Sequence, residues 1–141
     1  MARKKFSITT EVERGEDANS FVVKARGPRC SRGPKDTVEL PDGVCGVVRV
    51  VKTSNGPQVQ RLVAYRGRGV TTALLKRAAE EACSTMDAPL AADAYTGVLG
   101  QGFWETHEKK GNAAVEWKDS VDGKTKLYKL KCPVGDLKGG R

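Results

Sequence analysis

The chain has 141 residues and 38% hydrophobic side chains, with 25 basic and 17 acidic residues that give a formal net charge of +8. This length suits one domain with its own core, and the positive charge favours a polyanionic partner such as nucleic acid or a polyphosphate cofactor. The same charge is also typical of an ordinary solvated surface. No apolar run approaches the about 20 residues of a membrane span, and the basic first residues lead into no apolar signal segment. We therefore expect a cytoplasmic protein without a membrane partner.

The four cysteines are widely spaced, at Cys30, Cys45, Cys83 and Cys132, without the short intervals of a zinc site. Only one histidine, His107, could add a further metal ligand. Disulfides are rare in chains that are not secreted. We therefore expect no metal and no disulfide, with Cys45 and Cys83 as small core residues.

The first half of the chain predicts strands. Residues 6–13 alternate in polarity, and residues 20–26 follow after turn-forming residues, as in a hairpin. A basic loop rich in glycine and proline follows at 27–36. Two further strands are predicted over 44–52 and 58–65, joined by an Asn-Gly turn signal.

The second half changes period. An amphipathic helix is predicted over 70–83, a short buried strand over 90–94, and a short helix over 101–110 that ends at a glycine. Strands at 113–119 and 124–131 flank an Asp-Gly hairpin signal. One face of the first helix is apolar and comprises Leu74, Leu75, Ala78, Ala79 and Ala82, with Lys76, Arg77, Glu80 and Glu81 opposite. The fold class is thus α+β, a mixed and mostly antiparallel sheet with two helices.

A glycine-rich turn precedes the first helix in "YRGRGVTTALLKRAAEEA" (65–82). Such a turn before a helix N-terminus can hold phosphate groups. A P-loop is excluded, because Gly69 is followed by Val70 and Thr71 rather than by Lys-Ser/Thr. A dinucleotide fingerprint is excluded as well, because Thr72 stands where its third glycine would be.

The turn fits a third pattern, Arg/Gln-x-x-Gly-x-Gly/Ala, at Arg66 and Gly69, with Thr71 in place of the last small residue. It resembles the acyl-CoA-binding motif of the GNAT superfamily of N-acyltransferases. The resemblance continues through "PLAADA" and "GFWETHEKKG" and covers residues 58–131. The sequence of this segment most resembles that of short GNAT-like proteins of tailed phages. If the protein is encoded by a phage, the expected cytoplasm is that of the host.

The resemblance implies a single GNAT-like domain over residues 1–132, with a strand-rich half (1–64), an acyl-CoA-binding half (65–132) and a flexible tail (133–141). The first two helices of the family are missing from the pattern. The implied function is acetyl-CoA-dependent N-acetyl transfer to an unidentified amine, with acetyl-CoA as co-substrate. The implied cofactor-binding residues are Val63, Arg66, Gly67, Arg68, Gly69, Val70 and Thr71. A tight turn without a ligand is the alternative.

Candidates for catalysis follow from the same comparison. The family's fourth helix often carries a tyrosine that protonates the leaving thiolate, and Trp104 stands at that position, where an indole cannot supply a proton. Asp93 is a candidate general base or an ordinary strand-end acid, and Tyr95 is a candidate substitute acid or a packing residue. His107 is expected to be a solvated surface residue. Phe103 and Trp104 are expected to be core anchors rather than a stacking site.

A function of another class stays open, a non-catalytic module associated with nucleic acid. Its support is the net charge, the basic segment 24–35 and the basic tail "KLYKLKCPVGDLKGGR". Against it, these basic stretches lack interleaved aromatic residues for base stacking.

Overall fold

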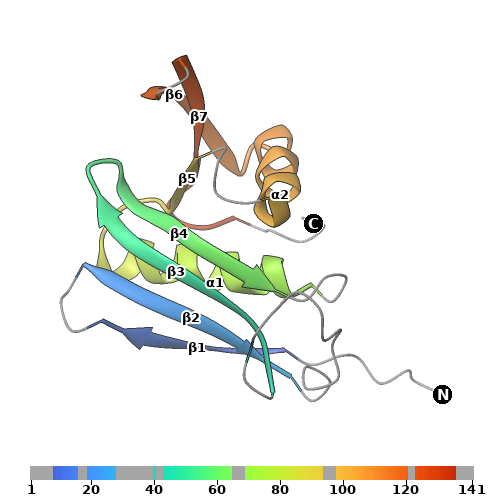
Figure 1. Ribbon diagram of the computed structural model, residues 1–141. Coiled ribbons are helices and arrows are strands. Elements are labelled where there is room, and N and C mark those ends of the chain that lie inside the picture. Colours follow the sequence, from blue (N-terminus) through green and yellow to red (C-terminus); the bar gives the residue numbers. More distant parts are fainter. Residues whose placement is uncertain are drawn as a thin grey trace.

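The computed structural model describes residues 8–15, 19–27, 40, 43–64, 69–93, 98–120 and 123–135. Within them the chain forms one sheet with two helices packed beside it (Figure 1). In chain order the elements are β1 (Thr9–Arg14), β2 (Ser20–Arg26), β3 (Val44–Thr53), β4 (Gly56–Ala64), α1 (Val70–Thr85), β5 (Ala91–Asp93), α2 (Val98–Lys109), β6 (Ala113–Ser120) and β7 (Gly123–Leu130).

The strands lie in the order β1-β2-β3-β4-β5-β7-β6. Every neighbouring pair is antiparallel except β4 and β5, which run parallel and are connected through α1. The α+β class and the mixed, mostly antiparallel sheet with two helices are therefore confirmed. No helix precedes Val70 in the residues that the structure describes.

The β3–β4 hairpin forms at the predicted Asn-Gly signal. Its register closes at Thr53 opposite Gly56, and Gly56 has a φ of 91°, which glycine adopts without a steric penalty. The hydroxyl of Thr53 accepts a hydrogen bond from the Asn55 N–H at 3.0 Å and donates to the Gly56 carbonyl at 3.1 Å. Local turn chemistry thus sets the hairpin that carries β4.

Helix α1 packs the predicted apolar face on the sheet. The buried helix residues are Val70, Leu74, Leu75, Ala78, Ala79, Glu81 and Ala82. The same core cluster includes the strand residues Phe21, Val23, Ala25, Val48, Val50 and Val59. Burial of this aliphatic surface is the main stabilising contribution to the domain.

Glu81 corrects the prediction that it lies on the polar face of the helix. Its side chain is only 5% exposed and forms ion pairs with Arg14 of β1 and Arg77 of α1. The contact of Glu81 Oε2 with Arg14 is close but lies outside hydrogen-bond geometry, so it acts as an ion pair. β1 supplies the partner that makes burial of the carboxylate tolerable, and helical periodicity alone cannot reveal such a partner.

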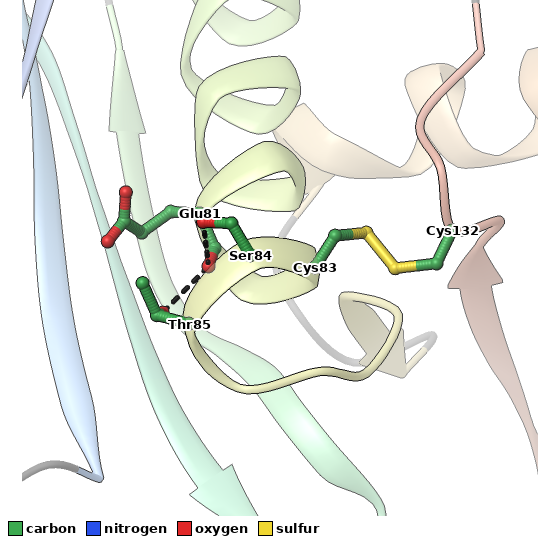
Figure 2. Close-up of a disulfide and its surroundings, with 5 residues drawn as sticks. All are labelled: Glu81, Cys83, Ser84, Thr85 and Cys132. Atoms are coloured by element: carbon green, nitrogen blue, oxygen red, sulfur yellow. Dashed lines mark hydrogen bonds between the residues drawn. A yellow bond between two sulfur atoms is a disulfide. The ribbon is translucent and has the colours of Figure 1, made fainter.

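The cysteines correct the prediction that the chain has no disulfide. Cys83, in the last turn of α1, is bonded to Cys132, just after β7, across a sequence separation of 49 residues (Figure 2). Their Cα atoms are 5.8 Å apart, within the range that a disulfide requires. Cys45 is fully buried as expected but is also disulfide-bonded, and no described cysteine is free. The expectation of free thiols rested on the compartment, whereas the fold brings Cys83 and Cys132 together across 49 residues.

His107 corrects a second expectation, that of a solvated histidine. It is fully buried on α2, with its ring 4.6 Å from that of Phe103. Asn112 Nδ2 lies 3.0 Å from His107 Nδ1, which fits donation by the amide to that nitrogen. Phe103 and Trp104 are buried as predicted, and they anchor α2.

The segment after β7 is described only as far as residue 135, and Val134 packs against the core. The rest of the predicted tail, and most of the basic loop at 27–36, lie outside the described residues. In the part of the chain that is described, no helix has the length and apolar character needed to cross a membrane.

Candidate functional site

The site lies where the sheet changes from antiparallel to parallel, which we call the β4–β5 seam, the boundary between β4 and β5. A single registered pair, Gln58 opposite Ala91, joins the two strands there. β4 continues to Ala64, and Figure 1 shows the two strands running apart beyond the pair. In open sheets with parallel strands, ligands bind beyond the carboxyl ends of the strands.

β4 is distorted next to the seam. Arg49 pairs with Arg61 and Val50 pairs with Val59, so Gln60 is the additional residue of a β-bulge. Bulges increase strand twist and are common beside functional sites. The bulge thus lies between the registered pair that joins β4 to β5 and the end of β4 that leads to α1.

α1 begins beyond the carboxyl end of β4. Its N-cap, Gly69, has φ 69° and ψ 14°, in the left-handed region, and offers no side-chain cap. The first turn holds no acidic residue, and the first intrahelical hydrogen bond runs from the Ala73 N–H to the Gly69 carbonyl at 3.1 Å. Backbone N–H groups and the positive end of the helix dipole at such a start attract anions.

Gly46 of β3 fixes how closely this helix start approaches the sheet. A Cβ atom at residue 46 would lie 2.7 Å from Val70 Cγ1, 2.9 Å from Leu74 Cδ1 and 2.9 Å from the Val63 carbonyl oxygen. Only glycine permits this packing. Sequence reasoning missed Gly46, although an isolated glycine within a β-branched run is the kind of signal that indicates close approach of another backbone.

The structure brings four of the seven predicted cofactor-binding residues to this end of the sheet. Val63 is partly buried near the end of β4, opposite Val47 of β3. Gly69 is exposed, Val70 is buried and Thr71 is partly exposed. The predicted residues Arg66, Gly67 and Arg68 lie outside the described residues.

Asp93, the candidate base, lies at the end of β5 and holds the seam together. Its Oδ2 accepts a hydrogen bond from Gln58 Nε2 of β4 at 3.2 Å and lies 3.2 Å from Lys118 Nζ of β6. The Asp93 side chain is 19% exposed. A carboxylate engaged on both sides suits an orienting role better than proton abstraction. The other catalytic candidate, Tyr95, lies outside the described residues.

Tyr128 is a buried titratable residue that sequence reasoning missed. It lies on β7 with its ring 6.0 Å from that of Trp104, nearly parallel to it. Burial raises the pKa of Tyr128, and the negative charges of Glu108 and Glu105 add to the rise, so the phenol remains protonated. The alternation of "KLYKLK" could have indicated that Tyr128 faces the core together with Leu130.

Comparison of the chain with protein-family models, with curated proteins and with solved structures finds no match. Among the described residues, no three histidine, cysteine, aspartate or glutamate side chains gather as a metal site would require. The function is therefore inferred from the seam, the helix start and the sequence motif.

Proposed function

We propose that the protein is an acetyl-CoA-dependent N-acyltransferase of the GNAT type that acts on an amine. The observation that carries the proposal is the joint geometry of β4, β5 and α1. The two parallel strands share one registered pair, and α1 starts at left-handed Gly69 beyond the end of β4. The Arg-x-x-Gly motif at 66–69 coincides with that start in the sequence.

Coenzyme A would bind with its pyrophosphate at the start of α1. The backbone N–H groups of the first turn would donate to the phosphate oxygens, and the helix dipole would favour their charge. A Cβ atom at residue 69 would meet no atom of the described residues within 4 Å, so these residues leave room for a ligand at the N-cap. The thioester would then extend along β4 past Val63 to the seam.

In the proposed reaction the neutral amine attacks the thioester carbonyl carbon. The C–N bond forms, the C–S bond breaks, the nitrogen loses a proton and the thiolate gains one. No covalent intermediate with the protein is required. The protein contributes the relative position of the two reactants and donors to the carbonyl oxygen, which are large terms in catalysis.

Protonation of the leaving thiolate is the slow step of the proposed reaction. Trp104, at the family's acid position, is buried between Phe103 and Tyr128 and cannot supply a proton. Water or Tyr95 must do so, and general acid catalysis is typically worth about 10²–10⁴-fold. We therefore expect acetyl-CoA binding to be detected more readily than turnover.

The test compares two glycine variants in a thermal-shift titration with acetyl-CoA. Gly69→Asp places a charged side chain at the proposed phosphate site, and we expect it to abolish the ligand-induced shift. Gly111→Asp is the matched control, because Gly111 also has a positive φ of 78° and also has open space around its Cβ position. Both variants strain the backbone similarly, and only Gly111→Asp should keep the wild-type shift.

For the wild-type protein, ligand at 100 times its dissociation constant should add about 2.7 kcal/mol to the free energy of unfolding. The absence of any shift at millimolar acetyl-CoA would refute the proposal. Equal shifts in the two glycine variants would place the ligand elsewhere.

The Cys83–Cys132 disulfide bears on the compartment, because thiol reductants in the cytoplasm oppose disulfides. The bond therefore argues against the cytoplasm that the sequence led us to expect. Counting free thiols on protein isolated from the cytoplasm under alkylating conditions tests this assignment. Complete oxidation of all four cysteines in freshly alkylated protein would point to an oxidising compartment.

A further inference from the structure

The sheet face turned away from α1 carries charge that the acyl-transfer proposal does not use. On β3, Gly46 contacts α1 and Val48 and Val50 belong to the core cluster, so the alternate residues project from the opposite face. We call this second surface of β1–β4 the outer face. Arg49 lies on it.

Arg49 and Arg61 form a cross-strand pair on the outer face. They are directly opposite in the antiparallel register of β3 and β4, so their side chains leave the sheet on the same side. Both are exposed. The bulge at Gln60 follows immediately, between this pair and the next registered pair.

The two arginines differ from the neighbouring cations on the same face. Lys24 pairs with Glu13 at 2.9 Å, and Arg26 pairs with Glu11 at 2.8 Å. In contrast, no described carboxylate lies within ion-pair distance of Arg49 or Arg61. Like charges placed directly opposite on adjacent strands repel one another. Arg49 and Arg61 therefore repel each other although the neighbouring cations, Lys24 and Arg26, are paired. Such an uncompensated pair is expected where a bound anion neutralises it.

We propose that Arg49 and Arg61 bind the phosphate backbone of a nucleic-acid strand. A guanidinium group donates two parallel hydrogen bonds to phosphate oxygens, and two such groups side by side can hold one phosphate from both sides or two successive ones. The net charge of +8 draws a polyanion to the protein. The partly buried Val47 and Val63, which form the adjacent registered pair, give the site an apolar border.

This site is separate from the proposed phosphate site at α1, because α1 packs on the other face of the sheet. Val63 borders both the arginine pair and the proposed path of the thioester, so the two sites adjoin at the end of β4. The arginine variant nevertheless leaves the phosphate site at α1 unchanged. It also differs from binding through the basic segment 24–35, because the pair lies on β3 and β4.

The experiment measures fluorescence anisotropy of a labelled oligothymidylate across a salt series. The test variant is Arg49→Gln/Arg61→Gln. The control variant, Lys76→Gln/Lys109→Gln, also removes two positive charges, but from exposed positions on the two helices. Because both variants have the same net charge, any difference between them reports on the position of the charge.

We expect the arginine variant to bind the oligonucleotide at least about tenfold more weakly than the wild type. Its slope of log affinity against log salt should also be shallower by about 1.4, as for two lost phosphate contacts to a single strand. The control variant should keep the wild-type slope. The arginine variant should melt at or above the wild-type temperature, because cross-strand repulsion is removed; a lower melting temperature would contradict the proposal.

Three further outcomes would overturn it. Equal weakening of binding in both variants would show that binding follows net charge alone. Absence of binding by the wild-type protein at low salt would show that nucleic acid is not a partner. Displacement of the oligonucleotide by inorganic pyrophosphate at equal phosphate concentration would show a site for small phosphates rather than for a strand. A requirement for much higher pyrophosphate supports the strand.

Discussion

The N-terminal half-sheet, β1–β4 with α1, and the C-terminal half-sheet, β5–β7 with α2, are held together in different ways. All four strands of the first pair along most of their length over a valine-rich core. In the second, β6 and β7 pair over eight residues, but β5 has only three residues. Between them the sheet provides one registered pair, Gln58 with Ala91. The Cys83–Cys132 bond, from α1 to the end of β7, ties the halves covalently. A sheet that opens at its seam thus needs stabilisation from outside the ladder.

The largest effect is expected from removing that covalent connection. Cys83→Ala/Cys132→Ala should lower the free energy of unfolding by about 4 kcal/mol, because a disulfide across 49 residues restricts the unfolded chain. Urea denaturation measures the loss. We expect the half-sheets to separate first, so fluorescence of Trp104 and Trp117, both in the second half, should change at lower urea than the overall β-sheet signal. A loss below about 1 kcal/mol would show that the ladder and core alone hold the halves together.

A smaller effect is expected in the N-terminal half-sheet from Gly46→Ala. The added methyl group would collide with Val70 and with the Val63 carbonyl, and overpacking of this kind costs about 1–3 kcal/mol. Because it displaces the start of α1, it should also weaken acetyl-CoA binding. Gly102→Ala, at an exposed position of α2, is the matched change in the other half, and it should instead stabilise by up to about 1 kcal/mol. If Gly46→Ala binds acetyl-CoA with normal affinity, the ligand does not bind at the start of α1.

The features of the fold that could be predicted from sequence are the local ones. Periodicity revealed the apolar face of α1, and turn chemistry revealed the β3–β4 hairpin, because both are local properties. Burial of Glu81 was missed because it depends on Arg14, which β1 supplies and local patterns do not reveal. Burial of His107 was also missed, although its partner Asn112 lies only five residues later, in the turn after α2.

The pairing of the strands at the seam could not be predicted from local sequence patterns either. The order strand, helix, strand indicated a crossover, but not that β4 and β5 would share a single pair. The Cys83–Cys132 bond depends on a contact across 49 residues, and the Arg49–Arg61 pair depends on the bulge at Gln60, which shifts the hairpin register by one residue. The motif at the start of α1 was visible because it lies within a few consecutive residues.

At the seam, Asp93→Asn should have a modest effect on stability, about 1 kcal/mol, because the ion pair with Lys118 is partly solvated. Its effect on turnover is more informative. Loss of a general base would lower the rate by about 10²–10⁴-fold and remove its pH dependence in the acidic range. Loss of an orienting group would lower it much less and keep the pH profile. We expect the second result, because both Gln58 and Lys118 already engage the carboxylate.

The smallest effect belongs to Tyr128 in the C-terminal half-sheet. Burial raises its folded-state pKa above the ordinary value of 10.0, with a further rise from Glu108 and Glu105. The unfolded chain therefore loses this proton first, so stability should fall as the pH rises from about 10 through the folded-state pKa. Tyr128→Phe should remove that part of the alkaline loss, measured by urea denaturation at successive pH values. An identical alkaline loss in Tyr128→Phe would assign it to other groups.

Amide hydrogen exchange with and without acetyl-CoA tests the proposed acyl-CoA site at the seam, because it reports on both half-sheets at once. We predict that the ligand slows exchange at the end of β4, in the first turn of α1 and along β5, while β1 and β2 exchange as before. Protection confined to β1 and β2, or no protection at saturating acetyl-CoA, would contradict an acyl-CoA site at the seam.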